Sequence, residues 1–320
     1  MEKINTSIVG FGLSGRYFFA PFIEYDSSYN LHSFVTSQKE MVNGEYPEAI
    51  VYKSIDEVIT NSDIRLLVVA SPNFTHFDYT QKALLAGKHV VVEKPFTVTA
   101  NEARQLIKLA GERNLVLAPF QNRRWDGDFL TVKRIIEEQE LGEIVYFESH
   151  FDRYNPQYTR TDWKNKPLPG NGILYDLGPH LIDQALCLFG MPEEIFADIG
   201  THRKNAEVDD FFDIQLYYNE LKVVLKAGVM VREQGPRFIV HGRKGSFIKH
   251  GLDPQEMNLR NGMKPSNEKL GAGKKQNYGL LHTEKEGKVV REKIETINGN
   301  YRKYFQNMAD AVKGAEHMAV

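Results

Sequence analysis

Two side chains capable of proton transfer lie four residues apart in the segment GNGILYDLGPHLID, which spans residues 170–183. If a helix begins near Asp176, Pro179 falls in its first turn, where a missing N–H costs nothing, and Asp176 and His180 share one face. A carboxylate beside an imidazole suits general acid–base chemistry, and the positive end of the helix favours the neutral imidazole that a base requires. The alternative is structural: Asp176 caps the helix, and His180 is a core histidine with satisfied hydrogen bonds.

Glu93 and Lys94 place an acid and an ammonium group directly after the apolar run of residues 90–92. That run is typical of a buried strand, so the pair stands at a strand's carboxyl end, where ligands bind in open α/β sheets. An ammonium group there can stabilise negative charge that develops on a substrate oxygen. Taken alone, neighbouring Glu and Lys are also a common surface pair.

A glycine-rich turn near the start of the chain complements these motifs: Gly10, Gly12 and Gly15 follow the apolar run of residues 4–9. The first glycine permits a sharp turn, the second lets the backbone approach a pyrophosphate, and the third lets helix and strand pack closely. N–H groups at the start of the helix, from Leu13 on, would then face the phosphates. The pattern predicts a dinucleotide site; the alternative is a helix-capping loop that binds no ligand.

The end of the second expected strand favours NADP over NAD. An acidic residue about twenty positions after the glycine turn usually binds the ribose 2′-hydroxyl, but here the chain has Thr36, Ser37 and Lys39. Hydroxyl and ammonium groups can bind a 2′-phosphate, which a carboxylate would repel. The alternative is an ordinary polar loop compatible with either cofactor.

The buried run of residues 66–70 is followed by four residues that we expect to contact the cofactor: Ser71, Pro72, Asn73 and His76. They too stand at the carboxyl end of a strand. Two structural alternatives remain: Asn73 or Thr75 only caps the next helix, and His76 is a surface histidine.

The elements that must position these motifs alternate along the first part of the chain. Short β-rich runs alternate with helical spacing, for example in residues 100–111, which follow a Thr99 cap. This alternation predicts a parallel sheet with helices on both faces. We therefore expect a doubly wound α/β dinucleotide-binding domain over residues 1–121.

From residue 122 the pattern changes to that of an α+β domain, which we extend to residue 320. A helix around residues 129–136, a strand at 144–151 and a helix at about 176–189 come first. Strands separated by short polar links then predict an antiparallel sheet; they span residues 195–199, 211–218, 222–231, 237–240 and 246–248. The lysine-rich segment 253–293 is expected to be a solvated loop and hairpin region.

Composition excludes several classes of function. With 320 residues and a formal net charge of −2, the chain lacks the basic excess that attracts nucleic acid. No apolar run approaches the ~20 residues needed to cross a bilayer, and no signal-type segment precedes the first strand, so we expect a cytoplasmic protein. Cys187 is the only cysteine, so no disulfide can form within the chain. We expect no metal site.

Taken together and in this order, the glycine turn, the Ser71 motif, Glu93-Lys94-Pro95, and Asp176 with His180 resemble the Gfo/Idh/MocA oxidoreductase family over nearly the whole chain. Residues 122–126, 148–153 and 251–256 are most similar to its bacterial NADP-dependent scyllo-inositol dehydrogenases. The resemblance implies an N-terminal Rossmann domain and a C-terminal domain built on a large, mostly antiparallel sheet. Relatives usually continue for another helix, so we expect the printed sequence to stop before it.

The resemblance also implies roles for individual residues. Lys94, Asp176 and His180 would be catalytic, and Glu93, Asn73 and His76 would help to place the cofactor. Trp163 would lie in a loop that approaches the cofactor phosphates, although an aromatic anchor for that loop is an equally good interpretation.

These inferences predict hydride transfer between NADP, or NAD, and a secondary alcohol or ketone of a polyol or sugar. Asn122, Trp125 and Arg153 are the candidate substrate residues, whereas Arg123 and Arg124 are expected to form ion pairs at the domain junction. The alternatives are a non-catalytic dinucleotide sensor or co-regulator and a dehydrogenase of a non-sugar such as a dihydrodiol. An open sheet face in the second domain must be covered, which predicts a homodimer or homotetramer.

Overall fold

The computed structural model describes residues 2–159 and 163–320, and the chain divides into two compact units. The first comprises Met1–Asn122, Glu256–Leu270 and Tyr301–Val320, and the second comprises Arg123–Gln255 and Gly271–Asn300. The sequence placed everything after residue 121 in one second domain, whereas residues 256–270 and 301–320 group with the first unit.

The first unit contains a six-stranded parallel sheet with the order β3-β2-β1-β4-β5-β6. Its strands are β1 (Ile4–Val9), β2 (Tyr29–Val35), β3 (Ile50–Tyr52), β4 (Leu66–Val69), β5 (His89–Val92) and β6 (Leu117–Pro119). All four residues of β4 are buried, as expected for a central strand covered on both faces. This order reverses direction next to β1, and the crevice beyond the strand ends there is where dinucleotides bind. The predicted doubly wound sheet is confirmed.

Helices lie between these strands along the chain, except the last one, which comes from the C-terminal end, and some helices carry their own capping signals. They are α1 (Ala20–Tyr25), α2 (Lys39–Glu45), α3 (Ile55–Ile59), α4 (His76–Leu85), α5 (Ala100–Glu112) and α9 (Arg302–Val312). At α5, Thr99 accepts a hydrogen bond from the Glu102 N–H at 3.2 Å, and the Glu102 carboxylate accepts one from the Thr99 N–H at 2.9 Å. This capping box confirms the predicted cap.

Aromatic packing explains why α9 belongs to the first unit. Phe305 of α9 stacks on Phe22 of α1, with ring centroids 4.8 Å apart and planes 4° from parallel. Tyr304 also donates a hydrogen bond to the Pro119 carbonyl at 3.3 Å, and Tyr29 of β2 donates to the Phe305 carbonyl at 2.5 Å. The C-terminal segment therefore completes the core of the first sheet.

The second unit contains an eight-stranded sheet with the order β14-β13-β12-β11-β7-β10-β9-β8. Its strands are β7 (Ile144–His150), β8 (Glu194–Gly200), β9 (Phe211–Tyr217), β10 (Lys222–Gly228), β11 (Phe238–Gly242), β12 (Gly245–Lys249), β13 (Gly279–Lys285) and β14 (Lys288–Ile294). All neighbouring pairs are antiparallel except β7 and β10. The prediction of a large, mostly antiparallel sheet is confirmed, and the expected hairpin within residues 253–293 is the β13–β14 pair.

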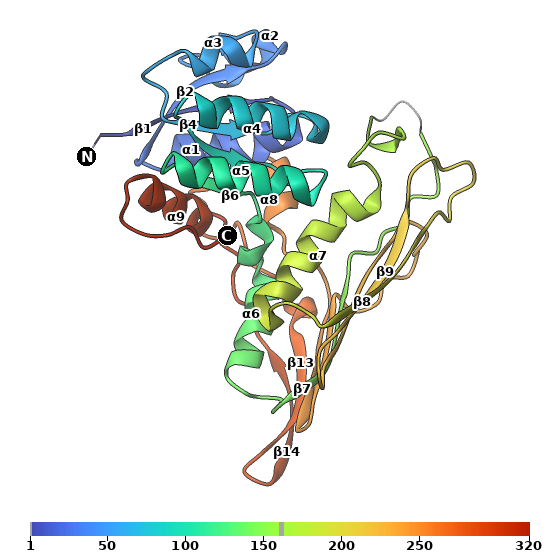
Figure 1. Ribbon diagram of the computed structural model, residues 1–320. Coiled ribbons are helices and arrows are strands. Elements are labelled where there is room, and N and C mark those ends of the chain that lie inside the picture. Colours follow the sequence, from blue (N-terminus) through green and yellow to red (C-terminus); the bar gives the residue numbers. More distant parts are fainter. Residues whose placement is uncertain (1, 160–162) are drawn as a thin grey trace. The chain divides into compact units, whose positions relative to one another are not determined.

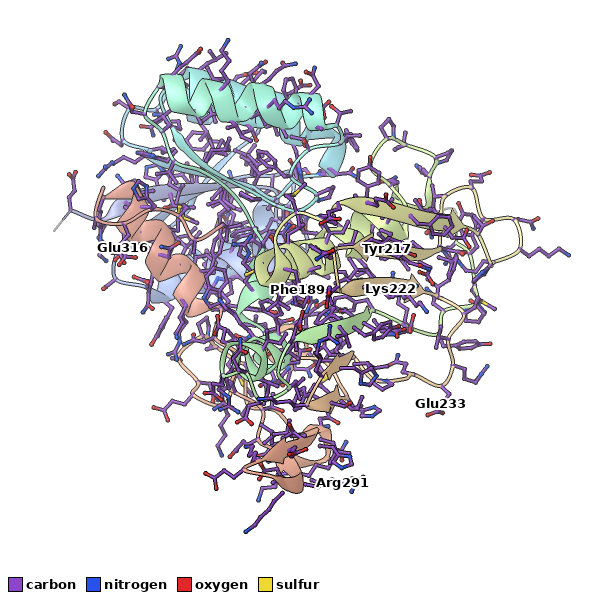
Figure 2. All side chains as sticks on the ribbon, turned by 60° about the horizontal axis from the view of Figure 1, so that its bottom comes forward. Phe189, Tyr217, Lys222, Glu233, Arg291 and Glu316 are labelled. Carbon is purple, nitrogen blue, oxygen red and sulfur yellow. The ribbon has the colours of Figure 1, made fainter. Side chains whose placement is uncertain are left out.

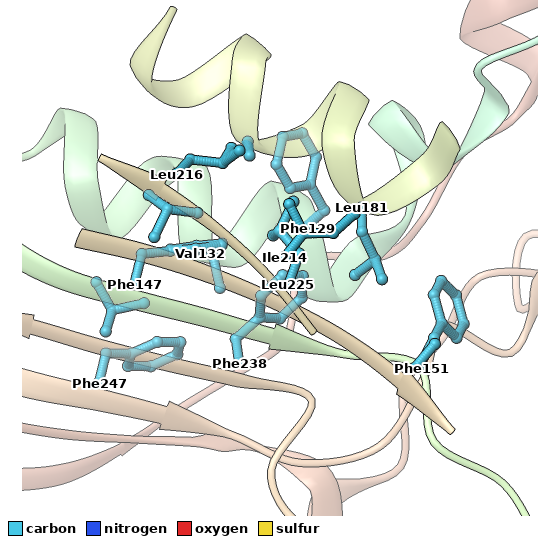
Figure 3. Close-up of a cluster of buried hydrophobic side chains, with 14 of the residues drawn as sticks. Phe129, Val132, Phe147, Phe151, Leu181, Ile214, Leu216, Leu225, Phe238 and Phe247 are labelled. Atoms are coloured by element: carbon cyan, nitrogen blue, oxygen red, sulfur yellow. The ribbon is translucent and has the colours of Figure 1, made fainter. Parts of the chain in front are cut away.

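Two helices, α6 (Gly127–Glu137) and α7 (Ile173–Phe189), cover one face of this sheet (Figure 1). The buried side chains between them and the strands, such as Phe147, Leu181 and Phe238, form the core of the unit (Figure 3). The opposite face is largely polar; Tyr217 and Lys222, for example, lie on paired positions of β9 and β10 (Figure 2). A short helix α8 (Gln255–Arg260) follows β12.

No helix in the described part of the chain is both long and apolar enough to cross a bilayer. The same residues contain no group of three or more His, Cys, Asp or Glu side chains arranged to hold a metal ion.

Candidate active site

The glycine turn at the end of β1 has the backbone geometry that a dinucleotide requires. Gly10 has a φ of +103°, and a Cβ there would lie 2.5 Å from the Ala70 carbonyl oxygen. A Cβ on Gly15 would overlap the carbonyl oxygen of Gly10. A Cβ on Gly12, by contrast, would meet nothing within 4 Å, so only this glycine leaves open space beside the backbone. The turn therefore fits a pyrophosphate at Gly12.

The helix after the turn begins as a short π-helix, Ser14–Phe19, which continues into α1. The sequence predicted a helix here but not this form. Wide helical turns of this kind are rare and occur frequently at functional sites. Leu13, just before it, is 46% exposed, so the start of the helix is accessible to a ligand.

The end of β2 presents hydroxyl and ammonium groups, as the sequence indicated. Thr36 accepts a hydrogen bond from the Gln38 N–H at 3.1 Å, and Ser37 and Lys39 are exposed. Lys39 is the first residue of α2. These groups are available to a 2′-phosphate.

His76 is a fixed, buried residue, so the alternative that it lies at the surface is wrong. It is 1% exposed, its Nδ1 lies 2.7 Å from the Pro95 carbonyl oxygen, and its Nε2 lies 3.0 Å from that of Ser71. Burial lowers the pKa of His76, although both carbonyls act in the opposite direction. The histidine thereby joins the loops that follow β4 and β5.

Asn73 and Thr75 do not cap α4 through their side chains. Asn73 opens a short 3₁₀-helix, Asn73–Thr75, and its side chain accepts a hydrogen bond from the Phe74 N–H at 2.8 Å. Thr75 donates to the Pro72 carbonyl at 2.7 Å and lies 2.6 Å from the Ser71 hydroxyl. The motif is therefore an internally bonded loop at the end of β4.

Glu93 is buried rather than part of a surface pair with Lys94. Its side chain is 7% exposed and accepts hydrogen bonds from the Ser14 hydroxyl and from the backbone N–H of Lys94. The carboxylate therefore connects the glycine turn to the loop that carries the candidate catalytic lysine.

In the second unit, α7 carries Asp176 and His180 on successive turns, as predicted, but it begins earlier than expected. Gly172 precedes it with a φ of +99°, and Asp209 accepts a hydrogen bond from the Leu174 N–H at 2.7 Å. Asp176 is therefore in the first turn and is not the N-cap. Pro179 lies inside the helix rather than in its first turn, because α7 starts at Ile173.

Because α7 begins at Ile173, His180 lies beyond the reach of the positive end of the helix. The field of a helix end falls off within the first turn, and His180 is the eighth residue of α7. The positive end of the helix therefore acts on Asp176 rather than on His180. His180 is 4% exposed, and its ring centroid lies 6.3 Å from that of Phe151.

Two cations surround Asp176. Lys164 Nζ lies 3.0 Å from one carboxylate oxygen, and the Arg153 guanidinium lies 3.6 Å from the other. Arg153, a predicted substrate residue, is thus brought to the candidate catalytic helix. Trp163 begins the 3₁₀-helix Trp163–Asn165, but its side chain lies outside the described part of the structure.

Hydrogen bonds and ion pairs hold the segment after β6 in place. Asn122, which opens the 3₁₀-helix Asn122–Trp125, is 5% exposed, and the Trp125 carbonyl accepts a hydrogen bond from the Asn300 N–H at 2.9 Å. Arg124 forms a two-pronged ion pair with Asp183 of α7, at 2.6 and 2.8 Å. Arg123 pairs with Asp126 at 3.0 Å. Both arginines form ion pairs, as expected, but both partners belong to the second unit, so these pairs do not bridge the two units.

Both parts of the chain match models of one protein family. Residues 4–120 match the oxidoreductase family with an NAD-binding Rossmann fold, and residues 129–248 match the GFO/IDH/MocA C-terminal domain. The chain belongs to the Gfo/Idh/MocA family. It is therefore a member of an oxidoreductase family that binds a nicotinamide dinucleotide, and the resemblance inferred from its motifs is confirmed.

Individual relatives of this family member cover nearly the whole chain. The scyllo-inositol 2-dehydrogenase (NADP(+)) IolW of Bacillus subtilis is 38% identical over 98% of this chain and 87% of its own length. The uncharacterized oxidoreductase YdgJ of Escherichia coli is 40% identical over 98% of this chain and 90% of its own length. The structure of the putative oxidoreductase yvaA from Bacillus subtilis matches with a TM-score of 0.95 and 38% identity, covering 100% of this chain and 92% of that one.

The sequence analysis did not single out three buried polar residues of this Gfo/Idh/MocA protein that lie on α7 or bond to its neighbours. Arg237, Gln184 and Asp128 are all buried polar residues of the second unit, and Gln184 lies one turn after His180. A charged residue within an apolar strand pattern, such as Arg237 before β11, was the one available signal.

Proposed function

We propose that this Gfo/Idh/MocA member is an NADP-dependent dehydrogenase that oxidises a secondary alcohol of a polyol or sugar, with inositol-like compounds as the first candidates. The observation that carries the proposal is the buried His180 of α7, one turn after Asp176, in a chain that also carries Lys94 after β5. The name of the relative IolW supports the choice of inositols.

In this proposal each side chain has one task. His180 accepts the proton of the substrate hydroxyl, a role that typically contributes about 10²- to 10⁴-fold to the rate. Lys94 polarises the same oxygen and stabilises the negative charge that develops on it. Asp176 orients His180 and binds a neighbouring hydroxyl. The nicotinamide supplies the hydride chemistry when it is bound.

The cofactor would be held by the first unit. Gly10, Gly12, Leu13 and Gly15 would bind the pyrophosphate, and Ser71, Pro72, Asn73 and His76 would border the cofactor at the end of β4. Thr36, Ser37 and Lys39 would bind a 2′-phosphate, which favours NADP over NAD. The NADP(+) in the name of IolW agrees with this choice.

A reduction assay tests the proposal. The purified protein is mixed with NADP+ or NAD+ and with a panel of inositols, hexoses, their acids and dihydrodiols, and absorbance at the reduced nicotinamide band is followed. Reduction with an inositol or sugar and a preference for NADP+ are expected. Dinucleotide binding without reduction across the panel would indicate a sensor, and reduction only with dihydrodiols would indicate a non-sugar substrate; either result overturns the proposal.

Variants assign the roles. His180→Gln and Lys94→Ala are each expected to lower kcat by at least about 10²-fold, because each removes a group that acts in the transition state. NADP+ affinity should change little in His180→Gln. His317→Gln, at an exposed histidine near the C-terminal end, is the matched control and should retain full activity. A normal rate in Lys94→Ala would reject the role of the lysine.

We also propose that two or more copies assemble through the uncovered face of the second sheet. Tyr217, Lys222 and Glu148 lie on this face by register, and Phe196 of the edge strand β8 is 57% exposed. Light scattering at micromolar concentration should therefore report a dimer or tetramer, and Phe196→Asp should weaken it. A monomeric wild-type protein would exclude this assembly.

A further inference from the structure

Three polar residues occupy successive turns on one side of α7: Asp176, His180 and Gln184. Gln184 is 1% exposed, and both ends of its amide are bonded. Its Oε1 accepts a hydrogen bond from Arg237 at 3.0 Å, and its Nε2 donates one to the Arg123 carbonyl at 2.9 Å. Because one end meets a donor and the other an acceptor, the amide has a single satisfactory orientation.

Arg237 is the centre of this network. It is 3% exposed, and besides Gln184 it donates to the Ser149 hydroxyl at 2.6 Å and to the His150 carbonyl at 2.8 Å. Its Nε also lies 3.6 Å from the Asp128 carboxylate. One guanidinium group thus connects α7 to β7 and to α6.

Burying the guanidinium group of Arg237 costs free energy, because the charge loses its contact with water. This burial lowers the pKa of Arg237 to about 10, even though Asp128 acts in the opposite direction. Apolar residues of similar volume often stabilise a core as well as a buried ion pair does, or better. Stability alone therefore gives no reason for a guanidinium here, whereas directional hydrogen bonds hold two elements in one defined position.

The ring of Phe151 is close to both the guanidinium group of Arg237 and the imidazole of His180. Arg237 lies 4.2 Å and Arg123 lies 4.9 Å from the ring centroid of Phe151, and that ring is a neighbour of His180 at 6.3 Å. Figure 3 shows Phe151 and Leu181, the residue after His180, in the core between α7 and the sheet. His180 therefore lies one turn before Gln184 on its own helix and beside the ring of Phe151, which follows β7.

We propose that Arg237 and Gln184 are positioning residues for His180, which fix α7 against the sheet so that the imidazole keeps one location. The inference rests on the proposed function, in which His180 is the general base. Neither residue is expected to touch substrate or cofactor. They act by holding the base where proton transfer is possible, and a displacement of about 1 Å in such a group can cost about 10²-fold in rate.

Kinetics of Arg237→Met, Arg237→Lys and Gln184→Leu test the proposal. Arg237→Met and Gln184→Leu should lower kcat by about 10- to 100-fold, while KM for the alcohol and the dissociation constant of NADP+ change less than about twofold. Arg237→Lys should recover part of the loss, because it keeps the charge and one donor. The double variant Arg237→Met/Gln184→Leu should be no slower than the slower single variant, since both remove the same contact.

Lys249→Met is the matched control for loss of a buried cation in the same unit. Lys249 is 2% exposed and donates to the His250 and Asn277 carbonyls, both at 2.7 Å. This variant should lower the unfolding temperature yet keep kcat per folded molecule. Equal losses of kcat in Lys249→Met and Arg237→Met would overturn the proposal, as would an unchanged kcat in Gln184→Leu.

A readout that needs no turnover separates this proposal from the proposed function. The ring C2 proton of His180, assigned by its disappearance in His180→Gln, should give one sharp NMR resonance in the wild type. It should be broadened or split in Gln184→Leu and unchanged in Lys249→Met. If no substrate is oxidised, the proposed function fails, and this resonance still decides whether the network holds His180 in one place.

Discussion

The hydroxyl of Ser14 donates a hydrogen bond to the carboxylate of Glu93, across 79 residues of sequence. Ser14 opens the π-helix after β1, and Glu93 follows β5, so the bond spans the strand end of β4 that lies between them in the sheet. The glycine turn and the loop that carries Lys94 are therefore not independent, because a hydrogen bond within the first unit links them.

Ser14→Ala is expected to destabilise the protein more than Glu93→Gln. Removing the hydroxyl leaves a buried carboxylate oxygen with one partner fewer, which costs about 1–3 kcal/mol. In Glu93→Gln the amide oxygen can still accept from the Lys94 N–H, the amide NH2 can donate to the Ser14 hydroxyl, and no charge is left to satisfy. Urea unfolding monitored by circular dichroism measures both. In the Glu93→Gln background, Ser14→Ala should cost clearly less than in the wild type. Equal costs in the two backgrounds would show that the bond does not contribute.

Alanine at two glycines should separate folding from cofactor binding. At Gly10 a side chain would be strained by the positive φ and would collide with the Ala70 carbonyl, so Gly10→Ala should lower the free energy of unfolding by about 1–3 kcal/mol. At Gly12 a Cβ meets nothing, so Gly12→Ala should keep the stability of the wild type. Its Cβ would occupy the space of a pyrophosphate, and NADP+ affinity should fall by at least about tenfold. Thermal unfolding and fluorescence titration with NADPH measure the two effects.

Unchanged NADP+ affinity in Gly12→Ala would contradict the placement of the pyrophosphate. Gly44→Ala, in α2, is a suitable control because a Cβ there also meets nothing within 4 Å. It should change neither quantity by more than the small gain expected from helix propensity.

Lys39 should discriminate between the two dinucleotides. Lys39→Ala removes the ammonium group at the start of α2, so the dissociation constant of NADP+ should rise by about 5- to 50-fold through loss of a charge-assisted hydrogen bond. That of NAD+, which has no 2′-phosphate, should stay the same. Lys108→Ala on α5, which removes an equal charge from an exposed pair with Glu112, is the control. A parallel loss for NAD+ and NADP+ would assign Lys39 to general electrostatics instead.

Local signals in the sequence predicted the parts of the fold that are stabilised locally. The glycine turn after β1 and the Thr99 cap of α5 each depend on a few adjacent residues, and both are present. Asp176 and His180 likewise share one side of α7 as predicted, because any helix that contains both residues brings them to the same side.

Features that depend on distant residues were not predictable in the same way. The start of α7 is fixed by Asp209, which lies 35 residues after the Leu174 that it caps, so the helix begins one turn before the expected position. Residues 301–320 belong to the first unit because Phe305 stacks on Phe22, which is nearly the whole chain away in sequence. The hydrogen bond between Arg237 and Gln184 joins side chains 53 residues apart, and no single-sequence spacing encodes that pairing.

A charge cluster on β7 predicts how stability depends on pH. His150 lies 2.7 Å from Glu148 and 2.9 Å from Asp152. Burial alone would lower the pKa of His150, but the hydrogen bonds and charges of the two carboxylates outweigh it and raise the pKa to about 9. The hydrogen bond from His150 is in turn the main cause that lowers the pKa of Glu148 to about 2, with Tyr146 and Lys226 assisting.

A histidine with a raised pKa stabilises the folded state fully below its unfolded pKa, and the contribution is lost as the pH rises through the folded value. The free energy of unfolding should therefore fall by about 2 kcal/mol between pH 6.5 and 9.5, which is less than the full shift implies because the side chain is partly exposed. Urea unfolding at several pH values measures it. Asp253, whose pKa burial raises to about 6, completes most of its titration below this range.

The matched variant is His150→Gln, which keeps a hydrogen-bond donor but cannot titrate. It should be less stable than the wild type at pH 6.5, and the difference should shrink to near zero by pH 9.5, since the neutral wild-type imidazole then gives the carboxylates no more than the amide does. A constant difference between His150→Gln and wild type at every pH would mean that His150 carries no extra proton in the folded state, and the ion cluster on β7 would then contribute through packing alone.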